Sequence, residues 1–107
     1  MSKHFKEVFQ RDNYRCVYCC RDMMVDFDTF MIIEEDHLVP RSKDGEDIPE
    51  NVVIACAVCN MLKGDYAPDT KLTEANRIEY IAEIRRHVMS QRANKMKDYA
   101  SWTHSSN

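Results

Sequence analysis

The chain of 107 residues is long enough for one small domain, and a domain of this size buries only a modest hydrophobic core. No apolar stretch reaches the length of a membrane span, and the first residues lack the apolar block of a secretory signal. The sequence therefore argues against a membrane or secreted protein. We expect a cytoplasmic protein in which thiols stay reduced and paired cysteines bind metal.

The net charge of −3 is unevenly distributed along the chain. Residues 20–50 carry ten acidic and three basic side chains, a net charge of −7. Residues 1–19 have a net charge of +2 and residues 71–107 a net charge of +3. If the protein binds nucleic acid, its two ends have to attract the phosphates, and bound cations have to offset the acidic middle.

The N-terminal segment has the pattern of a short amphipathic helix. Phe5, Val8 and Phe9 recur at the spacing of one helical face. We therefore expect a helix over residues 2–12, capped by Ser2, whose aromatic face packs on the rest of the domain.

Two Cys-x-x-Cys pairs, Cys16 with Cys19 and Cys56 with Cys59, lie further apart than those of a simple zinc ribbon. Four thiolates satisfy a tetrahedral Zn²⁺ without an open position, so the pattern predicts one structural zinc ion. Zinc binding would add the stability that a small core lacks. A redox disulfide is disfavoured because a redox motif needs only one pair. Cys20 is left over, and we expect a passive neighbour rather than a fifth ligand.

The segment between the two cysteine pairs predicts two strands. Residues 21–29 fit neither a helix nor a strand period, and a turn of helix or a loop would both suit them. Residues 30–35 and 52–55 are short and contain β-branched side chains, so we read them as paired strands. The first strand then delivers Asp36 and His37.

Polar residues surround the second predicted strand. A loop over residues 40–50, with a tight turn at Gly45, leads to Asn51, which directly precedes the strand. Asn60 follows the second cysteine pair and is expected to open a short helix. Two strands and a helix would thus each direct one polar side chain to a common point, as in a compact metal site.

A longer helix is predicted over about residues 70–97. Its apolar positions form one stripe: Ile78, Ile81, Ile84 and Val88. Three arginines fall on or beside this stripe: Arg77, Arg85 and Arg92. They either cover the core with their apolar stems or contact DNA, and the pattern allows both. Residues 102–107 are expected to form a frayed end.

Four motifs together resemble the HNH endonucleases over roughly residues 11–65. They are Arg-Asp-Asn-Tyr-Arg-Cys-Val-Tyr-Cys from Arg11, Asp-His-Leu-Val-Pro from Asp36, the single Asn51, and Cys-x-x-Cys-Asn-x-x-Lys from Cys56. The resemblance implies an α+β fold: a small zinc-stapled ββα-metal domain with an N-terminal helix and a C-terminal helical extension. Residues 1–107 would form this single domain.

The chain departs from the family pattern at three places. Cys20 stands where the family usually has glycine, and residues 21–29 have no clear counterpart because the spacer before Asp-His is longer. Asn60 replaces a histidine, which is a variant that the family also uses. After residue 66 the resemblance says nothing.

The resemblance also implies roles for the polar residues. Asp36 and the side-chain oxygen of Asn60 would bind one divalent cation, and hard oxygen ligands suit Mg²⁺ or Mn²⁺. His37 would accept a proton from the attacking water. Asn51 would hold the loop that carries His37. Lys63, one helical turn after Asn60, would meet a phosphate or brace the site.

The sequence thus predicts a metal-dependent endonuclease that nicks duplex DNA with weak sequence preference, as a monomer or a weak dimer. Arg41 and Lys43 follow the histidine, where a phosphate backbone would lie, although surface solubility explains them equally well. The alternative is a catalytically silent module with the same zinc-stapled fold that binds nucleic acid or a larger nuclease. Intact Asp36, His37 and Asn60 favour the enzyme.

Overall fold

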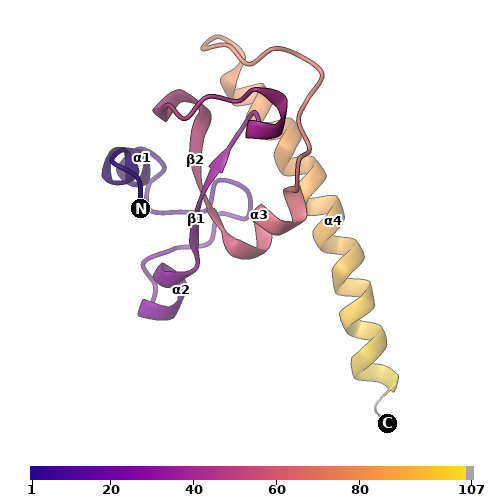
Figure 1. Cartoon of the computed structure of the whole chain (residues 1–107). Coiled ribbons are helices and arrows are strands. Elements are labelled where there is room, and N and C mark those ends of the chain that lie inside the picture. The colour runs from indigo at the N-terminus through magenta and orange to yellow at the C-terminus, as the bar shows by residue number, and fades with distance from the viewer. Residues whose placement is uncertain (106–107) are drawn as a thin grey trace.

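A computed structural model describes residues 1–105 of the chain. In chain order its elements are α1 (Phe5–Arg11), α2 (Phe27–Met31), β1 (Ile33–His37), β2 (Val52–Cys56), α3 (Ala57–Lys63) and α4 (Arg77–Ser105). Two short 3-10 turns, η1 (Arg41–Lys43) and η2 (Pro49–Asn51), lie between the strands. Helices flank the two-stranded sheet (Figure 1), so the predicted α+β fold with a ββα order is confirmed.

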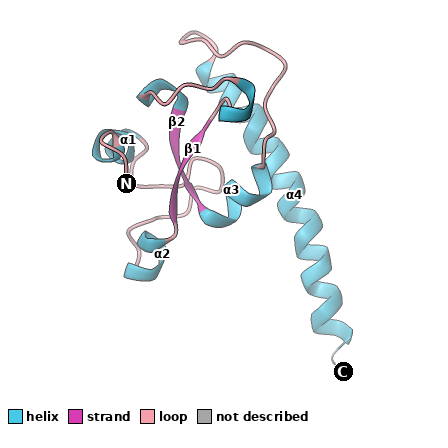
Figure 2. Cartoon of the chain, in the orientation of Figure 1, coloured by secondary structure: helices cyan, strands magenta, loops and turns pink. Residues whose placement is uncertain are grey.

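The antiparallel sheet positions the polar residues of β1 against a buried strand (Figure 2). Every residue of β2 is buried, since this strand runs through the core between α1 and α3. Asp36 pairs with Val53 and His37 with Val52. The first strand begins at Ile33 rather than at residue 30, because Asp26 accepts a hydrogen bond from the Thr29 backbone and starts the helical turn α2.

Helix α1 buries the face that the sequence predicted but begins later. Val8 and Phe9 are buried and Phe5 is half-buried. Ser2 was expected to cap the helix, but the N-cap position is occupied by His4. The backbone nitrogen and the hydroxyl of Ser2 both donate to the carboxylate of Glu35 on β1, so Ser2 fastens the N-terminal segment to the sheet instead.

The structure gives a different reason for glycine at position 45 from the tight turn that the sequence predicted. The left-handed residue in the turn after η1 is Asp44, with φ of 65°. A Cβ atom on Gly45 would lie 1.7 Å from the carbonyl oxygen of Val39. Glycine is therefore required here because two backbone segments approach closely, in the loop that carries His37.

Helix α4 starts at Arg77 rather than near residue 70 and continues to Ser105, beyond the predicted end at 97. Thr73 and Asn76 exchange side-chain-to-backbone hydrogen bonds, which hold the chain in a turn just before the helix. Residues 102–105 are helical rather than frayed, and residues 106–107 lie outside the described part.

The apolar stripe of α4 also needs one correction. Ile84 and Val88 are fully buried and Ile81 is half-buried, but Ile78 is 83% exposed. At ~100° per residue, Ile78 points about 120° away from Ile84, and Tyr80 fills the upper end of the buried face instead. Residues 93–103 of α4 are exposed, and this end of the helix extends away from the body (Figure 1). No helix in the described chain is both long and apolar enough to span a membrane.

Candidate metal centre and active site

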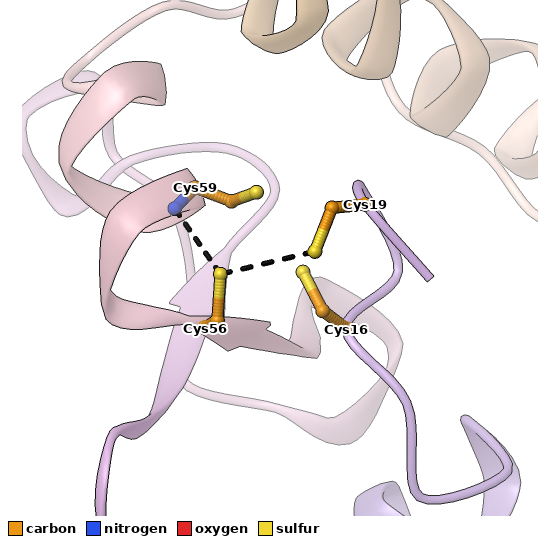
Figure 3. Close-up of side chains that lie close together, drawn as sticks. All are labelled: Cys16, Cys19, Cys56 and Cys59. Atoms are coloured by element: carbon orange, nitrogen blue, oxygen red, sulfur yellow. Dashed lines mark hydrogen bonds between the residues drawn. The ribbon is translucent and has the colours of Figure 1, made fainter. Parts of the chain in front are cut away.

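The four paired cysteines come together at one point. Cys16 and Cys19 lie on a tight turn in which the Cys20 backbone nitrogen donates to the Cys16 carbonyl oxygen at 2.9 Å. Cys56 ends β2 and caps α3, where its sulfur accepts from the Cys59 backbone nitrogen at 3.4 Å. The four side chains point toward a common centre (Figure 3). Their sulfur atoms all lie within 4.8 Å of one another.

This geometry fits a structural zinc ion. A tetrahedron with Zn–S bonds of ~2.3 Å places its sulfur atoms ~3.8 Å apart. The Cys19 and Cys56 sulfurs are 3.9 Å apart, and all five cysteines are free thiols rather than disulfides. Hydrogen bonding among the thiols, first from Cys16, lowers the pKa of the Cys56 thiol, and the bond shared with Cys56 raises the pKa of the Cys16 thiol. The predicted clustering is confirmed, and the ligand set leaves no open coordination position.

A second polar cluster forms around Asp36 on β1. Its side chain is buried, and its Oδ1 atom lies 3.3 Å from Nζ of Lys63 on α3. The Tyr18 hydroxyl donates to the other oxygen, Oδ2. Burial raises the pKa of Asp36, although Lys63 and Tyr18 act in the opposite direction. Tyr18 was not selected as a site residue from the sequence. Its position between Cys16 and Cys19 was the one feature that could have indicated a role.

His37 lies next to this cluster and faces the opposite side of the strand. Its Nε2 atom is 3.1 Å from Oδ1 of Asp47, whose other oxygen is 3.6 Å from the Arg41 guanidinium. When Nε2–H donates to Asp47, Nδ1 keeps its lone pair and is the nitrogen able to accept a proton. The sequence did not indicate Asp47 as a site residue, because carboxylates are common in loops and the contact with His37 forms only in the folded chain.

Asn51 holds the loop that follows His37. Its side-chain oxygen accepts from the Val39 backbone nitrogen at 2.9 Å. Its amide nitrogen donates to the carbonyl oxygens of Val39 and Glu46. Lys63 adds a hydrogen bond to the His37 carbonyl oxygen at 2.8 Å. Lys63 thus holds the backbone of His37 itself, and Asn51 holds the loop that follows it.

Comparison with protein families identifies the class of the segment that carries both clusters. Residues 16–66 match the family model described as HNH endonuclease. This segment is an HNH domain. The match spans both cysteine pairs, Asp36, His37 and Lys63, and it assigns a nuclease-type domain in general terms. The searches of curated proteins and of solved structures gave no significant match.

Asn60 takes a different place in the HNH domain from the predicted one. It is the fourth residue of α3, which begins at Ala57, so it does not open the helix. Asn60 and Lys63 are three residues apart and share one face of α3. Because Lys63 reaches Asp36, this face is directed toward β1. The role of Asp36 and Asn60 as metal ligands stays a prediction.

The arginines predicted to contact DNA divide into two groups. Arg41 and the neighbouring Lys43 are exposed on η1. Three of the four arginines of α4 are half-buried and donate to atoms of the domain itself. Arg77 donates to the Glu50 carbonyl oxygen, Arg85 to the Val17 carbonyl oxygen and Arg92 to the Cys59 sulfur. The three therefore fasten α4 to the HNH domain, and their contact with DNA stays a prediction.

The backbone conformation at Cys20 explains why glycine suits this position. Its φ is 64°, a left-handed conformation that glycine adopts without strain. Its thiol is exposed and is not one of the four clustered ligands, as expected.

Proposed function

We propose that the HNH domain is a metal-dependent endonuclease that hydrolyses phosphodiester bonds of duplex DNA. The observation that carries the proposal is His37, whose Nε2 atom is engaged by Asp47 and whose backbone is held by Lys63. A histidine fixed in this way has one ring nitrogen left for proton transfer. The family match supports a nuclease-type domain in general, and the reaction itself is our inference.

His37 would act as the general base. Asp47 orients the imidazole and favours the tautomer in which Nδ1 accepts the proton of the attacking water. General bases contribute about 10²–10⁴ to a rate, and only when they are held within hydrogen-bonding distance of the water. The hydrogen bonds of Asn51 and Lys63 to the loop backbone provide that fixed position.

Asp36 and Asn60 would hold one Mg²⁺ or Mn²⁺ ion. Each oxygen of an ionised carboxylate has two acceptor positions, so the bonds from Tyr18 and Lys63 still leave Asp36 an acceptor position on each oxygen. When bound, the cation would neutralise charge on the scissile phosphate and on the leaving 3′ oxygen. A carboxylate and an amide oxygen form a hard donor set, which suits these ions better than zinc.

DNA would approach over the exposed residues beside His37. Arg41 and Lys43 lie on η1, in the loop that joins His37 to Asp47. Both side chains are exposed, whereas three arginines of α4 are half-buried. Contacts of this kind go to phosphates rather than bases, so we expect salt-dependent binding with weak sequence preference. One base and one cation cut one strand, and a monomer would therefore nick.

Incubation of supercoiled plasmid with zinc-loaded protein and Mn²⁺ or Mg²⁺ tests the proposal. We expect nicked circles first and linear DNA only later, with 5′-phosphate and 3′-hydroxyl ends. His37→Ala should remove the activity, whereas His87→Ala should retain it because His87 stacks on Tyr66 at the surface of α4. Linear product from the start would instead mean that two sites act together.

A silent binding module is the second candidate, and one observation favours it. Asp36 is only 5% exposed and both of its oxygens already accept bonds from the protein. If Asp36 keeps these bonds and admits no cation, the domain would bind DNA or a larger nuclease without turnover. A plasmid that shifts in a gel but stays supercoiled with every divalent cation would identify this case.

A further inference from the structure

Tyr18 connects the two polar clusters of the HNH domain. It is 1% exposed and lies between the cysteines of the first pair, Cys16 and Cys19. The backbone just before it is tied to the sheet, since the Val17 nitrogen donates to the Ile54 carbonyl oxygen at 2.9 Å. From this fixed position the Tyr18 hydroxyl reaches Oδ2 of Asp36.

The two donors at Asp36 fix the plane of its carboxylate. Tyr18 bonds one oxygen and Lys63 the other, and the two come from different parts of the chain. A rotation of the carboxyl group about its Cβ–Cγ bond would break at least one of these contacts. Asp36 therefore presents its remaining acceptor positions in a fixed orientation.

Packing alone does not account for the hydroxyl of Tyr18. Phenylalanine would fill the same buried volume without a polar group, and a buried hydroxyl costs free energy unless it is hydrogen-bonded. The bond to Asp36 is the one that the Tyr18 hydroxyl makes among the described residues. Asp36 and Lys63 are two of the four buried polar or charged residues described, so half of the buried polar side chains belong to the cluster that Tyr18 contacts.

We infer that Tyr18 is a positioning residue, through which the first zinc-binding turn orients Asp36 toward the divalent cation. The inference rests on the proposed function, in which Asp36 is a ligand of that cation. The zinc-binding turn would then serve the reaction as well as the fold, because it fixes the backbone from which Tyr18 reaches the carboxylate. Residues that hold a metal ligand in this way typically change metal affinity or activity about 10- to 100-fold when they are replaced.

Tyr18→Phe in the full zinc-loaded chain tests the inference. Mn²⁺ binding without DNA is followed by electron paramagnetic resonance, and the Mn²⁺ concentration for half-maximal plasmid nicking is measured separately. We expect both to shift to about tenfold higher Mn²⁺, with the KM for plasmid and the zinc content unchanged. Tyr80→Phe is the matched control, since Tyr80 is 3% exposed in the same core, and it should behave like the wild type.

Each other outcome is decisive. Equal Mn²⁺ affinity in Tyr18→Phe and wild type, with nicking intact, overturns the inference and leaves the proposed function standing. Loss of zinc or a lower melting temperature in Tyr18→Phe but not in Tyr80→Phe assigns the hydroxyl to the fold and also overturns it. A wild-type protein that neither binds Mn²⁺ nor nicks plasmid overturns the proposed function, and this inference with it.

Discussion

The cysteine cluster and the Asp36–His37 cluster differ in composition and exposure. The first contains four identical ligands, three of them buried, on one tight turn and at the junction of β2 with α3. The second combines a buried carboxylate and ammonium with His37, which is half-buried, and Asp47, whose side chain is 55% exposed. Identical ligands in a closed shell suit a metal that stays, whereas a graded set reaching the surface suits one that meets substrate. We expect the first cluster to determine stability and the second to determine chemistry.

The largest expected effect is loss of the fold in Cys59→Ser. Cys59 is fully buried, and removal of one thiolate breaks the tetrahedral ligand set on which a small core depends. Elemental analysis should show less than one zinc per chain, and circular dichroism should show lost helix. Cys20→Ser is the control and should change neither. Full zinc content and an unchanged melting temperature in Cys59→Ser would contradict the structural role of the metal.

His37→Ala should isolate chemistry from stability. The imidazole is not part of the core, so we expect the nicking rate to fall at least ~100-fold while zinc content and DNA affinity stay near the wild-type values. Initial rates on supercoiled plasmid and a filter-binding titration measure the two quantities. A variant that still cuts at the wild-type rate would remove His37 from the mechanism.

Lys63→Met should show that the buried ion pair of the second cluster also contributes to stability. The Lys63 and Asp36 side chains are 1% and 6% exposed, so the substitution leaves a buried carboxylate without its counter-charge. Loss of one partner of a buried pair costs about 3–5 kcal/mol, and we expect about 3 kcal/mol less free energy of unfolding in urea. Lys63→Met combined with Asp36→Asn should lose less, because no lone charge remains. Equal losses in both variants would mean that packing, not charge, is responsible.

Arg92→Gln should have the smallest effect and refine the description of the cysteine cluster. Arg92 donates to the Cys59 sulfur at 3.2 Å and offsets part of the negative charge of four thiolates. We expect about tenfold faster zinc transfer to a chelator, with nicking unchanged while zinc is saturating. Arg86→Gln, at an exposed position of the same helix, is the control. The same transfer rate in both variants would leave Arg92 with only a packing role.

The parts predicted correctly from the sequence depend on short-range patterns. The clustering of the two cysteine pairs, the strand at residues 52–55 and the strand that carries Asp36 and His37 follow from spacing and from β-branched residues. Element boundaries were less accurate, because side-chain contacts set them. Asp26 starts α2, which includes residues 30 and 31 of the expected strand, and Asn76 delays the start of α4.

The sequence by itself determined the zinc ligands, because four cysteines in two close pairs have one economical way to bind a metal. It also determined that residues 52–55 form a strand, because this short run is apolar and rich in β-branched side chains. Only the tertiary structure decided the partners of the polar residues: Tyr18 with Asp36, Asp47 with His37, and Lys63 with both Asp36 and the His37 backbone. These contacts join residues 10 to 27 positions apart, and no local periodicity encodes such distances. Gly45 shows the same limit, since its requirement comes from the Val39 carbonyl oxygen that the folded loop brings against it.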